Sequence, residues 1–199
     1  MEDIIASIAG NVQSKGDPGK VLHALEAANQ KHFQATNDHL IILGADKADK
    51  IEKALLDRPS CKPQVILELG TYIGFSAIFL ASVCPDAHVF SFDPDSHIQH
   101  LAQKLISHAG LSDRVSLVNS TLQAAPARVL EKLVGNVELL FLDHEKGLYA
   151  SDLEHCLEHD LFSRRVPGLP IVLADNIRYL SKPLANEKIP WRARVYCLS

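Results

Sequence analysis

The fold is decided by residues 65–76, which read VILELGTYIGFS. An apolar run at 65–69 leads into two glycines, Gly70 and Gly74, and then into an apolar segment at 77–83 that has the length of a short helix. Glycines at such a junction let backbone N–H groups approach a ligand closely and relieve crowding between strand and helix. We therefore expect a strand, a ligand-binding loop and a helix, with a tight turn that binds nothing as the alternative.

Short apolar runs recur along the rest of the chain and alternate with segments of helical period. Continuous apolar strands separated by helices indicate a parallel sheet that is buried on both faces. Right-handed crossovers then favour an α/β fold, a Rossmann-like, doubly wound, mostly parallel sheet of order 3-2-1-4-5 with helices on both faces. Ligands of such sheets bind beyond the carboxyl ends of the strands. The five expected strands are 65–69, 89–92, 115–118, 137–142 and 171–174.

Composition narrows the classes of protein that the chain can belong to. Its formal net charge of −4 and its 47% of hydrophobic residues describe a soluble globular protein and make nucleic acid an unexpected partner. No apolar run reaches the roughly 18 residues that span a bilayer, and Glu2 and Asp3 stand where a secretory signal would be basic. We expect a cytoplasmic protein without a membrane partner. The four cysteines are scattered and form no CxxC pair, so they indicate structural thiols.

Two carboxylates suggest the ligand of the glycine loop. Glu68 stands where a dinucleotide-binding loop would carry its first glycine, so a carboxylate occupies the place where a pyrophosphate needs room. This favours a cationic ligand over NAD, and S-adenosylmethionine, which carries an ammonium and a sulfonium, is such a ligand. Asp93 directly follows the second expected strand, at a position from which a carboxylate can accept both ribose hydroxyls. A helix cap before Pro94 is the alternative role for Asp93.

Polar residues also follow the fourth and fifth expected strands. Asp143 ends one strand, and Asp175 and Asn176 end its neighbour, so their side chains are expected to converge from strand ends about 4.8 Å apart. Carboxylate and amide oxygens suit Mg²⁺, which could hold two adjacent hydroxyls of a diol and activate one of them. Lys146 is placed to accept the proton as general base. The alternatives are helix caps for the two acids and a solvated surface charge for the lysine.

These segments together resemble the catechol O-methyltransferase family, over roughly 16–176. The resemblance implies Mg²⁺ on Asp143, Asp175 and Asn176, and Lys146 as general base. It also implies a set of contacts to S-adenosylmethionine: Glu68, Gly70, Tyr72 and Ser76 at the methionine end, Asp93 at the ribose, and Ser120, Gln123 and His144 near the adenine. The matching segments are 16–18 (GDP), 66–77 (ILELGTYIGFSA), 108–111 (HAGL), 141–144 (FLDH) and 173–176 (LADN).

The domain organisation follows from these assignments. We expect a single domain over 1–199, with a helical amino-terminal region at 1–58, a cofactor-binding core at 64–176 and an atypical tail at 177–199. In the first region, turn residues precede a helix that runs to about Phe33, and a second helix covers 46–56 with Asp46 as its N-cap.

The tail is where the sequence departs most from the family. Only 195–198 resembles a strand, and the tail is too short for the gating loop and closing antiparallel strand pair of the family. The fifth strand is therefore expected to leave an exposed sheet edge. Glu187 is the one acid that could replace the family's substrate-contacting glutamate, and Trp191 is the only tryptophan. Glu145 stands where mammalian members place a tryptophan against the cofactor.

Residues 155–159 read HCLEH and match the inverted zincin pattern, which offers a peptidase as a different class of enzyme. The segment falls in the helix expected between the fourth and fifth strands, where two exposed histidines are the simpler interpretation.

The sequence therefore predicts an S-adenosylmethionine-dependent, Mg²⁺-dependent O-methyltransferase that acts on one hydroxyl of a catechol or similar vicinal diol. The alternative is a catalytically impaired module that binds S-adenosylmethionine but lacks the closing carboxyl-terminal strands. The sequence leaves the oligomeric state and the choice among diols open.

Overall fold

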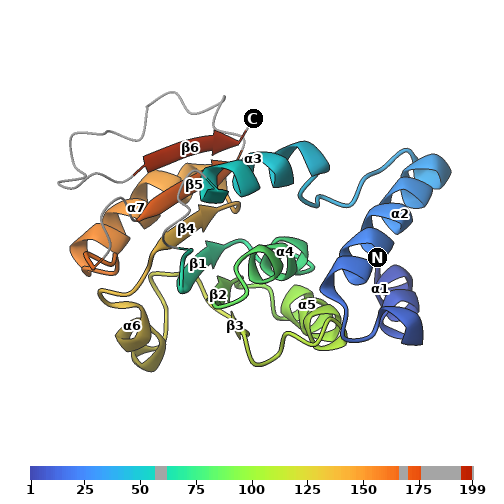
Figure 1. Cartoon of the computed structure of the whole chain (residues 1–199), viewed down its shortest axis with the longest axis horizontal. Coiled ribbons are helices and arrows are strands. Elements are labelled where there is room, and N and C mark those ends of the chain that lie inside the picture. Colours follow the sequence, from blue (N-terminus) through green and yellow to red (C-terminus); the bar gives the residue numbers. More distant parts are fainter. Residues whose placement is uncertain (57–61, 166–169, 176–193, 199) are drawn as a thin grey trace.

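A computed structural model of the chain describes residues 1–56, 62–165, 170–175 and 194–198. Within these residues, six strands form one sheet in which every neighbouring pair is parallel, in the order β3-β2-β1-β4-β5-β6 (Figure 1). The predicted order 3-2-1-4-5 is confirmed, with a further strand beside β5. The strands are β1 (Val65–Leu69), β2 (His88–Phe92), β3 (Val115–Val118), β4 (Leu139–Leu142), β5 (Ile171–Asp175) and β6 (Arg194–Leu198).

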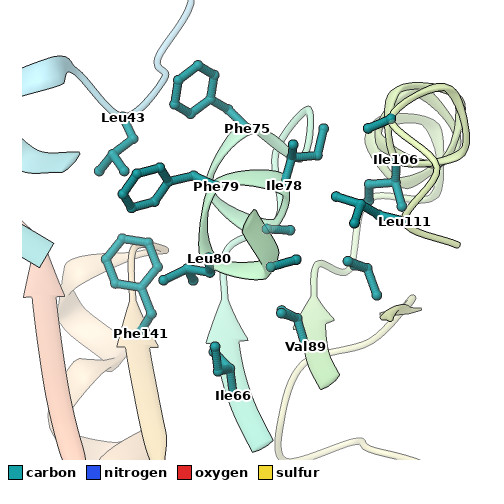
Figure 2. Close-up of a cluster of buried hydrophobic side chains, with 14 of the residues drawn as sticks. Leu43, Ile66, Phe75, Ile78, Phe79, Leu80, Val89, Ile106, Leu111 and Phe141 are labelled. Atoms are coloured by element: carbon teal, nitrogen blue, oxygen red, sulfur yellow. The ribbon is translucent and has the colours of Figure 1, made fainter. Parts of the chain in front are cut away.

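Each face of the sheet is covered by its own apolar cluster. Side chains alternate along a strand, so Ile66 of β1 points to one cluster and Leu67 to the other. Helices α4 (Phe75–Val83) and α5 (Ser96–His108) pack on the first face (Figure 2), and α6 (Ala127–Leu133) and α7 (Tyr149–Glu158) pack on the second. Burial on both faces explains why the strands read as continuous apolar runs.

The amino-terminal region consists of α1 (Glu2–Ala9), a 3₁₀ turn (Val12–Ser14), α2 (Pro18–Thr36) and α3 (Ala45–Leu56). Asp17 caps α2, since its carboxylate accepts a hydrogen bond from the Lys20 backbone N–H at 3.0 Å, and Pro18 follows at the first helical position. The predicted end of this helix at Phe33 was three residues short. The expected N-cap of the next helix was wrong as well, because α3 begins one residue before Asp46, which lies in its first turn.

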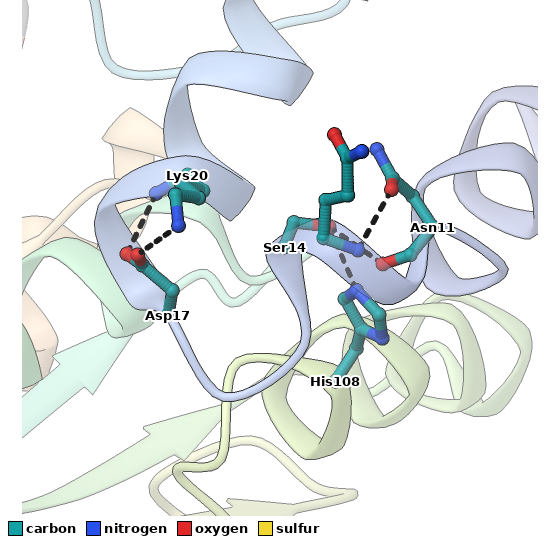
Figure 3. Close-up of polar contacts among 6 residues, drawn as sticks. Asn11, Ser14, Asp17, Lys20 and His108 are labelled. Carbon is teal, nitrogen blue, oxygen red and sulfur yellow. Dashed lines mark hydrogen bonds and ion pairs between the residues drawn. The ribbon is translucent and has the colours of Figure 1, made fainter.

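This region is held to the sheet domain by polar contacts at the end of α5. Ser14 Oγ lies 2.9 Å from Nε2 of the buried His108 (Figure 3). The Gly16 backbone N–H donates to the His108 carbonyl oxygen at 2.8 Å. Two buried isoleucines of α1, Ile5 and Ile8, join the same apolar cluster as α4 and α5. The amino-terminal helices therefore belong to the core that supports the first face of the sheet.

Two predicted boundaries in the core also need correction. The fourth strand begins at Leu139, because Val137 instead forms an isolated bridge with Phe162. Helix α4 begins two residues earlier than predicted, at Phe75.

The expectation of an exposed edge on the fifth strand is wrong, because β6 pairs with β5 along its length, from Ile171 opposite Arg194 to Asp175 opposite Leu198. The predicted strand at 195–198 is confirmed. Glu187 and Trp191, and the rest of the predicted tail up to residue 193, lie outside the described residues.

Candidate cofactor and metal site

A cavity of about 320 Å³ opens at the carboxyl ends of the strands, within the size range of small-molecule sites. Its walls come from the loops that follow β1, β2, β3 and β4, as expected for a doubly wound sheet. Leu69, Phe92 and Leu122 supply apolar surface. Six residues that the sequence assigned to cofactor binding line this cavity, namely Gly70, Tyr72, Asp93, Ser120, Gln123 and His144, together with the predicted metal ligand Asp143.

The two glycines of the loop serve backbone packing. Gly70 has φ +103°, and a Cβ there would lie 2.4 Å from the Asp143 carbonyl oxygen. Only glycine allows the loops after β1 and β4 to pass this closely. Gly74 precedes α4 with φ +84°, and a Cβ there would lie 3.2 Å from Cβ of Ala102 in α5. Gly70 thus allows the loop that carries Asp143 and His144 to lie against the carboxyl end of β1, and Gly74 allows the start of α4 to lie against α5.

Glu68 lies below this loop and is fully buried. Burial raises the pKa of its carboxyl from 4.5 to about 7, even though the nearby hydroxyls of Ser76 and Ser91 act in the opposite direction. The Ser91 hydroxyl donates to Oε2, whereas Oε1 has no hydrogen-bond partner among the described residues. Neither Glu68 nor Ser76 lines the cavity. A buried carboxylate with an unsatisfied oxygen is the kind of group that a cationic ligand stabilises.

Asp93 joins the first two loops of the site. Its Oδ2 accepts the Tyr72 backbone N–H at 3.0 Å, and its Oδ1 accepts the Asp95 backbone N–H at 3.0 Å. The alternative role of Asp93 as the cap of the next helix is wrong, because Asp95 is the residue that caps α5, through the backbone N–H groups of His97 and Ile98. Asp93 is half-buried at the cavity wall, where a carboxylate can accept hydroxyl hydrogen bonds.

The cavity is also lined by a carboxylate that the sequence analysis missed, that of Asp152. Asp152 of α7 is 2% exposed, and its two oxygens contact Nε2 of His144, at 2.5 Å, and the side-chain amide of Gln123. Asp152 therefore holds the side chains of His144 and Gln123 close together, and both were predicted to contact the adenine. An acid on the apolar face of α7, beside Leu153 and Cys156, was the signal that could have revealed it.

The predicted metal ligands Asp143 and Asp175 come together at the ends of β4 and β5. The register pairs Leu142 with Ala174, so the two acids follow adjacent positions of neighbouring strands. Burial raises the pKa of Asp143, and the charge of the Asp175 carboxylate raises it further, which indicates that the two carboxylates lie close together. The third predicted ligand, Asn176, lies outside the described residues.

A lysine that the sequence analysis did not select reaches this pair of acids. Lys47 of α3 places its Nζ 2.6 Å from Oδ2 of Asp175, whose side chain is 4% exposed. The predicted base, Lys146, begins a 3₁₀ turn, Lys146–Leu148, after β4 and is half-buried, but it does not line the cavity. The buried carboxylate of Asp175 and the half-buried carboxylate of Asp143 supply the hard oxygen donors that suit Mg²⁺, so the residues present fit that ion.

The histidine pair of the zincin-like pattern does not line the cavity. His155 is in α7 and His159 follows its last turn, and their rings stack with centroids 4.0 Å apart. His159 is exposed as predicted, whereas His155 is half-buried. Within the described ranges, no group of three or more His, Cys, Asp or Glu side chains could hold a metal ion.

The chain is similar to known methyltransferases. Residues 67–161 match the family described as a methyltransferase domain. A probable O-methyltransferase of Mycobacterium tuberculosis is 33% identical over 76% of this chain and 64% of its own length. The catechol O-methyltransferase of Bos taurus is 27% identical over 92% of this chain and 63% of its own length. The chain thus spans less than two thirds of these two curated relatives.

Solved structures agree on the fold. An O-methyltransferase from Bacillus cereus, solved with S-adenosylhomocysteine, aligns with a TM-score of 0.59 and 22% identity over 80% of this chain and 67% of its own. A methyltransferase of Podospora anserina, also bound to S-adenosylhomocysteine, aligns with a TM-score of 0.57 and 22% identity over 71% and 57% of the two chains. The Rossmann-like fold and the resemblance to the catechol O-methyltransferase family are confirmed. Among the described helices, none is long and apolar enough to cross a membrane.

Proposed function

We propose that this relative of the catechol O-methyltransferase family transfers a methyl group from S-adenosylmethionine to one hydroxyl of a catechol or a similar vicinal diol, with Mg²⁺ at the acidic pair. The proposal rests on one observation, that the cavity and the pair of acids share a residue, Asp143. Asp143 lines the cavity of cofactor size and also faces the buried carboxylate of Asp175. A methyl donor in the cavity and a diol at the acids would therefore be neighbours.

The cavity is suited to a ligand that is cationic at one end and carries an adenosine at the other. Glu68, with its unsatisfied buried oxygen, is proposed to balance the ammonium of the methionine end, beside Gly70, Tyr72 and Ser76. Asp93 would accept hydrogen bonds from the ribose hydroxyls. Ser120, Gln123 and His144 would contact the adenine; Ser120 Oγ is buried and has no hydrogen-bond partner among the described residues.

Asp143 and Asp175, with Asn176, are the proposed ligands of the metal ion. When bound, Mg²⁺ would supply a Lewis acid that orients two adjacent oxygens and lowers the pKa of one hydroxyl. Lys146 is proposed to take the proton from that hydroxyl. The oxygen then attacks the methyl carbon, the carbon–sulfur bond breaks with its electrons going to sulfur, and neutral S-adenosylhomocysteine leaves. Close orientation of the oxygen and the sulfonium supplies the main acceleration.

The test is methyl transfer from S-adenosylmethionine to a panel of catechol and caffeoyl substrates, with Mg²⁺ or with chelator. Calorimetry on the same preparation measures cofactor binding. Chelator should abolish turnover. Replacing Lys146 by methionine should lower turnover by about 10²- to 10⁴-fold, the usual range for a general base. Replacing Lys132 by methionine is the matched control, because that lysine is exposed on α6.

The outcomes separate the two functions that the sequence left open. Turnover that requires Mg²⁺ supports the enzyme and identifies its acceptor. Cofactor binding without turnover on any diol would favour the impaired binding module instead. Loss of both activities in a folded preparation would contradict the proposal as a whole.

A further inference from the structure

Lys47 and Asp175 lie 128 residues apart in the sequence and form an ion pair between the start of α3 and the end of β5. The Nζ–Oδ2 distance is 2.6 Å, and the lysine side chain is only 26% exposed. An ammonium so placed is largely withdrawn from water and is directed at a carboxylate that is almost completely buried. Exposed ion pairs contribute little to stability, but this pair compensates a charge that burial would otherwise make costly.

The ammonium also acts on the second acid. The negative charge of Asp175 disfavours ionisation of Asp143 and raises its pKa. The positive charge of Lys47 favours that ionisation and lowers the pKa of Asp143. Among the described residues, Lys47 thus brings a positive charge that acts on both carboxylates. A divalent cation would bring two positive charges to the same pair of acids.

The Lys47 ammonium and a divalent metal ion would compete for the same atom, Oδ2 of Asp175. Magnesium binds carboxylate oxygens at about 2.0–2.1 Å and requires a nearly octahedral shell. An ammonium that stays 2.6 Å from the same oxygen would hold one of its lone pairs, and its positive charge would repel an ion bound there. Lysine, with its flexible stem, can swing away, since Lys47 lies in the first turn of α3 and a quarter of its side chain already reaches solvent.

We propose that Lys47 is a built-in competitor of the metal ion, an internal cation that holds the Asp143–Asp175 pair in the metal-free chain and leaves Asp175 when a divalent cation binds. This inference rests on the proposed function, because it requires that the two acids form a metal site. Lys47 therefore sets the metal affinity of the site, and metal binding breaks a contact between α3 and the sheet.

The test is the affinity of Mn²⁺ for the chelator-treated full chain, measured by calorimetry and by the electron paramagnetic resonance signal of free Mn²⁺. Lys47→Met keeps the length of the side chain and removes its charge. It should bind Mn²⁺ about tenfold more tightly, which corresponds to about 1.4 kcal/mol. Lys53→Met removes the same charge from an exposed position of the same helix and should leave the affinity within about twofold.

Thermal unfolding supplies a readout that does not depend on turnover. In chelator, Lys47→Met should melt at a lower temperature than the natural chain, because Asp175 loses its counter-ion. Saturating Mn²⁺ should raise its melting temperature by more than it raises that of the natural chain. If Lys47→Met does not fold in chelator, Lys47→Gln, which keeps a hydrogen-bond donor without the charge, takes its place.

Equal or weaker Mn²⁺ binding by the Lys47 variants would overturn the inference while leaving the proposed function intact, provided that the natural chain binds Mn²⁺ and turns over. Absence of Mn²⁺ binding from all variants would overturn both the inference and the metal-dependent part of the proposed function. In that case cofactor binding by the same preparations would show whether the rest of the proposal stands.

Discussion

Replacing Glu68 by glutamine should stabilise the cofactor-free chain above neutral pH. The carboxyl is fully buried, and burial raises its pKa from 4.5 to about 7. The folded chain therefore keeps the proton of Glu68 over a pH range in which the unfolded chain has released it. In that range the folded state binds more protons, so the free energy of unfolding falls as the pH rises from about 4.5 to about 7 and then levels off.

The size of the effect follows from the two pKa values. One pKa unit corresponds to about 1.4 kcal/mol, so the ionised carboxylate destabilises the fold by about 3 kcal/mol at pH 8. Glutamine has the shape of the protonated acid and carries no charge. Relative to the natural chain, Glu68→Gln should gain up to about 3 kcal/mol at pH 8 and close to nothing below pH 4.5.

Urea unfolding at several pH values, without cofactor, measures this difference. Taking the difference between variant and natural chain removes the titrating groups that do not interact with Glu68. Glu68 also raises the pKa of Asp143, so the loss of its charge relieves Asp143 and acts in the same direction. Glu131→Gln is the control, because it changes an exposed acid of α6 and should stay within about 0.5 kcal/mol at every pH. A stability difference between the two chains that does not change with pH, or one that shrinks as the pH rises from 4.5 to 8, would refute the reasoning. Binding of S-adenosylmethionine should weaken in Glu68→Gln, since the ammonium loses its proposed partner.

Two further substitutions test the walls of the site. Gly70→Ala should destabilise the chain by at least about 2 kcal/mol and abolish cofactor binding, because its Cβ would lie 2.4 Å from the Asp143 carbonyl oxygen; chemical unfolding and calorimetry measure the two effects. Asp152→Asn should weaken the binding of S-adenosylhomocysteine and of adenosine by about tenfold, since an amide replaces the charged partner of His144. Unchanged adenosine binding would mean that this carboxylate is only structural.

The local pattern of the sequence was enough to predict the central sheet. Runs such as 65–69 and 171–174 are continuously apolar because both faces of the sheet are covered, and this requirement is visible in the sequence without any tertiary contact. The strand-end acids could be predicted for the same reason. Polar residues that directly follow buried strands must meet at the carboxyl edge of a parallel sheet, as Asp143 and Asp175 do.

Only the tertiary structure shows which residues from distant parts of the chain contact one another. No local signal distinguishes Lys47 from the other lysines of α3, because its meeting with Asp175 depends on how that helix packs against the edge of the sheet. Pairing of β6 with β5 is likewise a long-range contact, since a short apolar run does not specify its neighbour. Sequence periodicity records which side chains must be buried, whereas the charge balance inside the site depends on distances between elements far apart in the chain.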